Sequence, residues 1–121
     1  MHSLKVTATS LLVLALLALA GPSFGAPKPT PLVATVGPGF TITLTKAGKK
    51  VTTLKPGRYS ITVRDRSAIH NFHLTGPGVN RRSTVAEVRT LRPWVVTFKK
   101  GTYRYVCDPH AAMMKGSFTV R

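Results

Sequence analysis

The sequence is poor in cysteine, since Cys107 is the only one among 121 residues. One cysteine cannot form an intramolecular disulfide, which excludes a fold held together by disulfides. Small exported domains often depend on such bonds, and the N-terminal sequence described below indicates export. Cys107 must therefore have another role, either as a buried thiol or as a chemically active group.

Acidic residues are also scarce. Asp65, Glu87 and Asp108 stand against 18 lysines and arginines, and the formal net charge is +15 at pH 7. Such an excess predicts attraction to anionic surfaces, whether phospholipid, cell-wall polymer or an acidic protein. Nucleic acid is the least favoured partner. The basic residues occur in scattered pairs such as Lys49-Lys50, without an arm of interleaved aromatic residues.

A membrane-spanning apolar run is missing as well. The run at residues 11–20 is shorter than the roughly 20 residues that a spanning helix needs. It follows Lys5 and precedes small residues up to Ala26, an order typical of a secretory signal peptide. We expect residues 1–26 to be a cleaved signal peptide, whose loss lowers the net charge by one; an uncleaved membrane anchor is the alternative. The mature protein would then lie in the periplasm, the cell envelope or the extracellular space.

A helical stripe of apolar residues is absent too, and the pattern indicates strands. Residues 27–31, PKPTP, predict a linker, and residues 32–121 predict one domain. There, apolar and polar residues alternate over short segments bounded by Gly and Pro, which predicts a small β-sandwich or barrel. We expect an all-β Greek-key β-sandwich. The expected strands are 32–36, 40–45, 51–54, 58–64, 69–75, 84–90, 94–99, 102–107 and 116–121.

Alternation along a strand also predicts which side chains share a face, because residues two apart point the same way. In 102–107 this places Cys107 on the core face, together with the two tyrosines of that segment. In 69–75 it places His70 among the apolar side chains and His73 on the opposite face. Of these two histidines, His70 is therefore expected to be buried, and His73 to lie at the surface or beside a site.

The group that carries chemistry surrounds the single cysteine. Cys107, His110, Met113 and Met114 lie within eight residues, where a core strand ends at Pro109. Together with a histidine of 69–75 they offer a thiolate, two imidazoles and a thioether, a soft donor set that suits copper. Zinc is less favoured, because structural zinc sites usually use four Cys or His ligands. The alternatives are an inert core thiol, and a nucleophile paired with His110 that lacks an evident third orienting group.

Two segments resemble the ligand-bearing segments of the cupredoxins, especially plastocyanin and amicyanin: IHNFHL at 69–74 and YVCDPHAAMMKG at 105–116. The resemblance covers most of the mature chain in strand order. It implies one type 1 copper ion per chain, held by His70, Cys107, His110 and one methionine. It also implies that Asn71 helps to join the two ligand loops.

The methionine is where the sequence departs from the pattern. The family's Met-x-Gly spacing, counted back from Gly116, favours Met114. The two residues that amicyanin leaves between histidine and methionine would choose Met113 instead. Because the glycine opens the last expected strand, we expect Met114 to be the axial ligand, with Met113 as the alternative.

The resemblance implies an exported carrier of single electrons; a protein that buffers or delivers copper is the alternative. A copper enzyme is not expected, because the sequence has no His-x-His pair for a multicopper cluster and no second cysteine for a binuclear centre. The basic chain predicts an acidic redox protein, or one held at a membrane, as partner. It also makes an anionic envelope surface a possible partner, and we expect a monomer.

Overall fold

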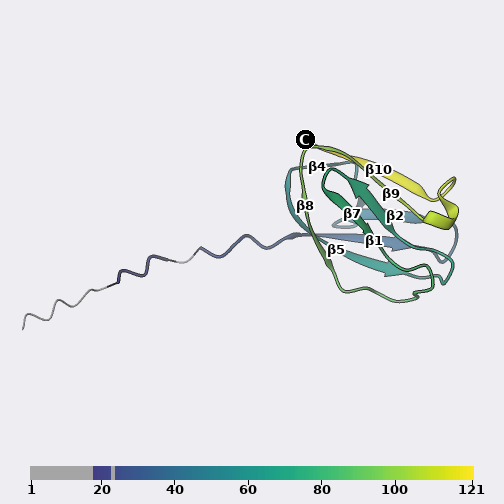
Figure 1. Cartoon of the computed structure of the whole chain (residues 1–121), viewed down its shortest axis with the longest axis horizontal. Helices are drawn as coiled ribbons and strands as arrows, with labels where there is room; N and C mark the ends of the chain where they lie inside the picture. The colour runs from purple at the N-terminus through teal and green to yellow at the C-terminus, as the bar shows by residue number, and fades with distance from the viewer. Residues whose placement is uncertain (1–17, 23) are drawn as a thin grey trace, which may run out of the picture.

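The computed structural model describes residues 18–22 and 24–121. Most of the expected signal peptide lies outside these residues. Residues 18–22 and 24–28 are exposed and have no regular secondary structure, and they lead as a linker into the domain (Figure 1). Within the described part of the chain, no helix is long and apolar enough to cross a membrane.

Two five-stranded sheets pack face to face, so the expected β-sandwich is confirmed (Figure 1). The first has the order β3-β2-β1-β5-β8 and contains β1 (Thr30–Val36), β2 (Ile42–Lys46), β3 (Lys49–Lys50), β5 (Gly57–Asp65) and β8 (Trp94–Phe98). The second has the order β4-β10-β9-β6-β7 and contains β4 (Thr53–Leu54), β6 (His73–Gly76), β7 (Val79–Arg82), β9 (Gly101–Val106) and β10 (Lys115–Val120). A 3-10 turn, η1 (Asp108–His110), follows β9.

Strand β1 begins at Thr30, inside the expected linker. It pairs in parallel with β5 along its whole length, from Thr30 to Val36. Its antiparallel pairing with β2 starts only at Val33. Pro31 therefore has no partner in β2 to which a backbone N–H would have to donate. A strand tolerates proline at such a position.

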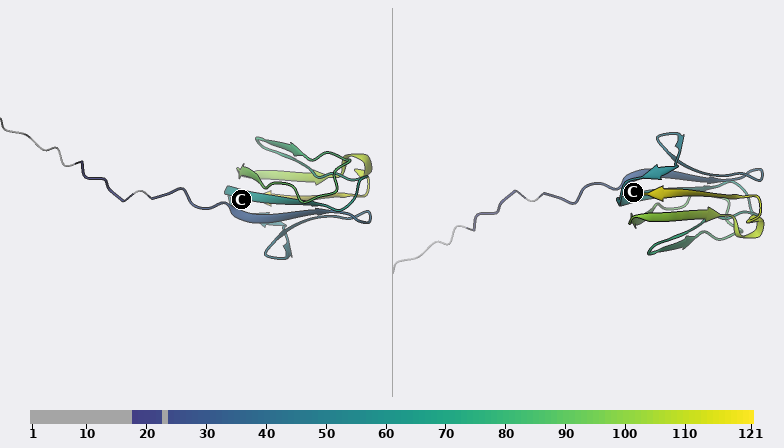
Figure 2. Two further views of the ribbon diagram at one scale, coloured as in Figure 1. Left: turned by 90° about the horizontal axis from the view of Figure 1, so that it is seen from below. Right: turned by 90° about the horizontal axis from the view of Figure 1, so that it is seen from above.

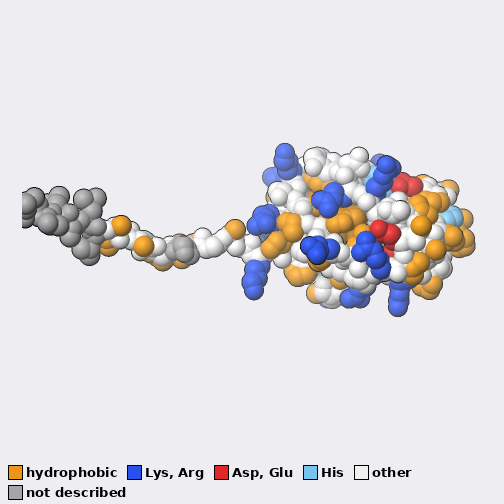
Figure 3. Space-filling view, turned by 60° about the horizontal axis from the view of Figure 1, so that its bottom comes forward, with side chains coloured by type: hydrophobic (Ala, Val, Ile, Leu, Met, Phe, Trp, Pro, Cys, Tyr) orange, Lys and Arg blue, Asp and Glu red, His pale blue; other side chains and the backbone are white. Residues whose placement is uncertain are grey.

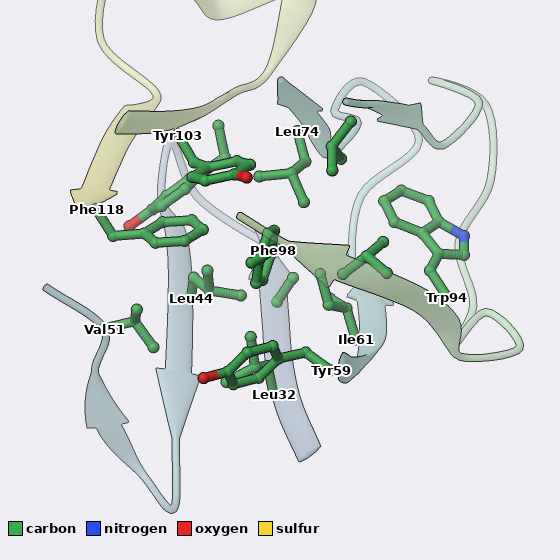
Figure 4. Close-up of a cluster of buried hydrophobic side chains, with 14 of the residues drawn as sticks. Leu32, Leu44, Val51, Tyr59, Ile61, Leu74, Trp94, Phe98, Tyr103 and Phe118 are labelled. Atoms are coloured by element: carbon green, nitrogen blue, oxygen red, sulfur yellow. The ribbon is translucent and has the colours of Figure 1, made fainter. Parts of the chain in front are cut away.

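The core lies between the sheets and follows the expected alternation. In β8, Trp94, Val96 and Phe98 are buried while the residues between them are exposed. Tyr103 in β9 lies 4.7 Å from Phe98 and 5.3 Å from Phe118, measured between ring centroids. These aromatic side chains converge from both sheets at one end of the core (Figure 4). Burial of such large apolar side chains is the main stabilising contribution to a fold of this size.

The expected strand at 69–75 is wrong in its first half. Only His73–Gly76 form a strand, and residues 69–72 belong to a loop. His70, Asn71 and Phe72 are all buried, at 0%, 2% and 0% exposure, whereas a two-sided strand would bury alternate residues. The alternation pattern thus correctly predicted that His70 points inward, although His70 lies in a loop and not in a strand.

The structure differs from the expected strands at other places as well. Residues 84–90 form a connection that touches the first sheet at one bridge, Arg64 with Thr90, and leaves Val88 59% exposed. Strand β7 was missed because three of its four residues are polar and exposed, which its position at the edge of the second sheet permits. Phe40 was expected in a strand but lies in the loop before β2.

Strand directions divide the domain into two ends. At one end, which we call the copper end because the copper ligands expected from the sequence belong to it, lie Cys107 after β9, the loop at 66–72 and the loop between β1 and β2. At the other, the linker end, the chain enters β1, β5 and β9 begin, and β10 finishes. Figure 2 shows the linker and the last residue at this second end, and the η1 turn at the first.

Candidate metal centre

Three side chains from separate parts of the sequence meet at the copper end. His70, Cys107 and His110 place one ligand atom each within 4.8 Å of one another. The two Nδ1 atoms are 3.1 Å apart, and the Cys107 Sγ lies 3.6 Å from Nδ1 of His70 and 3.5 Å from Nδ1 of His110. Cys107 and His70 are fully buried, and His110 is half-buried.

This triangle has the size of a metal site. A point equidistant from the three donor atoms lies about 2 Å from each of them, close to the usual bond between a late first-row metal ion and an imidazole nitrogen. One thiolate and two imidazoles in a plane are the donors of type 1 copper. The residues present therefore fit copper in number, kind and spacing.

The His70 ring is held in the orientation that such a site requires. Its Nε2 lies 2.9 Å from the carbonyl oxygen of Gly39, in the loop between β1 and β2. A carbonyl only accepts hydrogen bonds, so Nε2 carries the hydrogen and Nδ1 presents its lone pair to the cluster. Contacts of this kind fix both the tautomer and the direction of a ligating histidine.

The loop after β9 brings Cys107 and His110 together. Pro109 lies within η1, where its fixed φ suits a turn and its missing N–H is not needed. Backbone N–H groups of His110 and Met114 donate to the carbonyls of Cys107 and His110, at 3.0 and 2.8 Å. The Cys107 N–H donates in turn to the Met114 carbonyl at 3.0 Å, so the loop closes on itself.

The two methionines of this loop have opposite environments. Met114 is fully buried, whereas Met113 is 65% exposed. Gly116, two residues after Met114, pairs with Tyr105, and a Cβ at position 116 would collide with the Tyr105 ring. Only glycine allows this close approach, which sets the register of the chain that follows Met114.

Asn71 connects the two loops that carry the histidines. Its Oδ1 accepts the Asp108 N–H at 2.8 Å, and its Nδ2 donates to Asp108 Oδ2 at 2.7 Å and to the Ser83 carbonyl at 3.2 Å. The side chain is 2% exposed. These bonds hold His70, next to Asn71, at a constant distance from Cys107, next to Asp108.

His73 lies outside the donor cluster. Its Nδ1 is 2.7 Å from Asp108 Oδ1 and its Nε2 is 2.8 Å from Asn80 Oδ1. Partial burial raises the pKa of the Asp108 carboxyl, but the hydrogen bonds from Asn71 and His73 and the charges of His73 and Arg82 outweigh it and hold that pKa below its usual value. Asp108 thus remains a carboxylate that braces the cysteine loop.

A buried carboxyl lies at the end of β5, behind the loop that carries His70. Asp65 is 3% exposed; its Oδ1 accepts the Ser67 N–H at 3.1 Å, and its Oδ2 has no hydrogen-bond partner. Burial raises the pKa of Asp65, which the Ser67 hydrogen bond and the His70 charge only partly offset and the Glu87 charge raises further.

Two residues that contribute to the site were not predicted from the sequence. Phe40 packs edge-on against both histidines, with ring centroids 5.5 Å from His70 and 5.0 Å from His110. Gly39 supplies the carbonyl that orients His70. The signal was the segment GPGF at 37–40, whose glycines and proline indicate a loop and not the start of a strand.

The sequence matches a known family over residues 40–121, described as copper binding proteins of the plastocyanin/azurin family. This range includes the three cluster residues and both methionines of the cysteine loop. No curated protein matches the sequence.

Solved structures of similar fold agree with this match. Reduced rusticyanin has a TM-score of 0.54 at 24% identity, covering 79% of both chains. A reduced amicyanin variant has a TM-score of 0.52 at 19% identity, covering 78% of this chain and 86% of amicyanin. A chain of a heme-copper terminal oxidase dimer has a TM-score of 0.54 at 20% identity. The match covers 75% of the present chain and 63% of the oxidase chain, which is less than two thirds of the latter. At these identities the likeness establishes the fold.

Proposed function

Because the chain belongs to the plastocyanin/azurin family of copper-binding proteins, we propose that it is a type 1 copper protein that carries single electrons between redox partners. One observation carries the proposal: a buried thiol and two imidazole nitrogens lie 3.1 to 3.6 Å from one another. Bound copper supplies a one-electron couple between Cu(I) and Cu(II).

The proposed ligands are His70, Cys107 and His110 in one plane, with Met114 as the axial ligand. Burial supports Met114, because a side chain that is 65% exposed, as Met113 is, points to solvent. The backbone hydrogen bonds that link Met114 with Cys107 and His110 keep all three residues in one short loop. Met113 then belongs to the surface around the site.

The protein's contribution is to hold these donors in nearly one arrangement for both oxidation states. The Gly39 carbonyl orients His70, and Asn71 joins the His70 loop to the Cys107 loop. Both loops extend from strands of the packed sandwich. A donor set held in this way moves little when the charge of the site changes, which favours rapid electron transfer.

Electrons are proposed to enter and leave beside His110, the cluster residue that reaches the surface. Around it the surface is apolar: Phe40 is 56% exposed and Met113 is 65% exposed. The end of the domain opposite the linker is correspondingly rich in hydrophobic side chains next to histidine (Figure 3). A redox partner is proposed to dock on this surface. Exposed cations at the same end, such as Arg66 and Lys115, favour an acidic partner or one held at a membrane.

Buffering or delivery of copper is the alternative function, and burial argues against it. Transfer of an ion to another protein requires donors that a second ligand set can reach, whereas Cys107 and His70 are 0% exposed. An enzymatic function is not proposed, because the described part of the chain gathers one cluster of three His, Cys, Asp or Glu donors and no second cluster of this kind. Export to the periplasm, cell envelope or extracellular space is proposed from the N-terminal sequence.

Adding Cu(II) to the purified chain tests the proposal. We expect one copper per chain and intense absorption near the red end of the visible spectrum, from thiolate-to-Cu(II) charge transfer. Cys107→Ser, which replaces sulfur with oxygen at similar volume, should abolish the band while circular dichroism shows an intact sandwich. A folded Cys107→Ser variant that keeps the band would refute the assignment of the thiolate.

A further inference from the structure

The basic side chains that surround the linker end form a surface that the electron-transfer site does not use. A groove of about 790 Å³ lies where the linker meets the sandwich. Five exposed cations line it, together with Leu54, Pro56 and Tyr59: Lys28, Lys46, Lys55, Arg58 and Arg121. The name basic end is used for these five cations and the two lysine pairs described next.

Strand pairing adds two lysine pairs to the same end. Lys49 and Lys50 form β3, which pairs with the last residues of β2. Lys99 and Lys100 make the turn between β8 and β9, beside the start of β5, because Phe98 pairs with Gly57. All four are exposed. In Figure 3 blue side chains surround the point where the linker leaves the domain.

No carboxylate side chain balances this charge. The chain has three acidic residues, and all lie toward the copper end. Asp65 finishes β5, where it pairs with the last residue of β1, and Asp108 follows Cys107. Glu87 lies two residues before Arg89, whose carbonyl accepts the Asp65 N–H at 3.0 Å. The basic end therefore has nine cations and no acidic side chain, whereas the rest of the domain has eight cations and all three acidic residues.

The distance between the two ends separates their functions. Strand β1 has seven residues and runs from the linker end to the copper end, a rise of about 23 Å. Electrostatic attraction between exposed charges is largely screened beyond about 8 Å at physiological ionic strength. The basic end thus contributes little to the encounter of a partner with His110. A ligand that binds the basic end would therefore be separate from the redox partner.

We propose that the basic end binds the headgroups of an anionic phospholipid bilayer, with the copper end facing away from the membrane. If the apolar run at residues 11–20 is kept as a membrane anchor, which is the alternative to cleavage, the linker brings this end of the domain to the bilayer, because it leaves the domain here. The exposed cations extend from the groove to both lysine turns, so they can meet many headgroups on a flat surface at once. Each Lys or Arg near such a surface contributes about 1 kcal/mol.

The test uses the chain from residue 27 onward, which keeps every cation of the basic end. This part contains the whole core, whose first side chain in the described sequence is Leu32. Metal-free protein is mixed with phosphatidylcholine vesicles that contain about a third phosphatidylglycerol, near 0.1 M salt, and binding is measured by cosedimentation. Binding of metal-free protein does not depend on the proposed electron transfer.

Two matched triple variants locate the binding surface. One replaces Lys46, Arg58 and Arg121 with Gln, all in the groove. The control replaces one lysine and two arginines outside the basic end with Gln: Lys115, Arg66 and Arg92, all exposed. Both variants lose three charges, so an effect of net charge alone would be equal. We expect the groove variant to bind on the order of 100-fold more weakly and the control to change by less than about fivefold.

Three results would overturn the proposal. Equal losses in the two variants would show that net charge, and not the basic end, drives binding. Equal binding to vesicles of phosphatidylcholine alone would show that the headgroup charge is irrelevant. Binding to soluble polyphosphate without binding to vesicles would assign the basic end to a polymeric anion in place of a bilayer.

Discussion

Replacement of Asn71 by Ala should weaken both the fold and the metal site. The side chain is 2% exposed and makes three hydrogen bonds, two with Asp108 and one with the Ser83 carbonyl. A buried polar group left without its partner destabilises a protein by about 1 to 3 kcal/mol. The Ser83 carbonyl stays buried, whereas Asp108 can be rehydrated, so we expect a total loss of about 2 to 4 kcal/mol.

The same change frees the two ligand loops from one another. A residue that supports ligands in this way typically affects metal affinity by about 10- to 100-fold. Urea unfolding of the metal-free protein, followed by circular dichroism, measures the first effect, and competition with a copper chelator measures the second. Asn80→Ala is the control, because Asn80 is exposed and the one hydrogen bond of its side chain is to His73. If Asn71→Ala changed stability and copper affinity no more than Asn80→Ala, the reasoning about the loop connection would be refuted.

Three further outcomes follow from the site. His70→Ala should remove most of the charge-transfer band and His73→Ala little of it, because of these two histidines only His70 points its Nδ1 at the thiol. Equal loss in visible spectra would contradict this. Met114→Leu should shift the reduction potential in voltammetry and Met113→Leu should not, and the reverse would make the exposed methionine the axial ligand. Asp65→Asn should stabilise the metal-free protein by about 1 kcal/mol at pH 7. Burial raises the pKa of Asp65 in the folded state, so the wild-type protein gains stability as the pH falls through that pKa. The difference between the free energies of unfolding of the variant and the wild type, measured in urea, should therefore shrink at low pH. A difference independent of pH would show that burial does not destabilise the charged carboxyl.

Local sequence pattern predicted the sandwich because most strands bury one face. In β5, β8 and β9 alternate residues are buried, and these strands contain the aromatic residues that fill the core. The errors occurred where burial has another cause. Residues 70 to 72 are buried consecutively because a loop folds inward between the sheets, and β7 is polar because it lies at an edge.

The candidate site was predictable in its residue types and less so in its surroundings. Cys107 and His110 lie three residues apart, and His70 stands in a recognisable segment, so local sequence indicated all three. The Gly39 carbonyl contacts His70, and the Phe40 ring contacts His110. The two residues of each pair lie more than 25 positions apart in the sequence. Such contacts depend on how two loops meet at the end of the sandwich, which no local pattern encodes.

A redox titration of the copper-loaded protein tests whether the protein carries electrons. Visible absorption and protein-bound copper are followed together through repeated cycles of reduction and reoxidation. We expect one reversible one-electron transition, with complete loss and full return of the charge-transfer band. One copper per chain should be retained throughout, because Cys107 and His70 are buried and their loops are held together. Release of copper on reduction, or a band that does not return, would contradict electron transfer and favour a protein that delivers the ion.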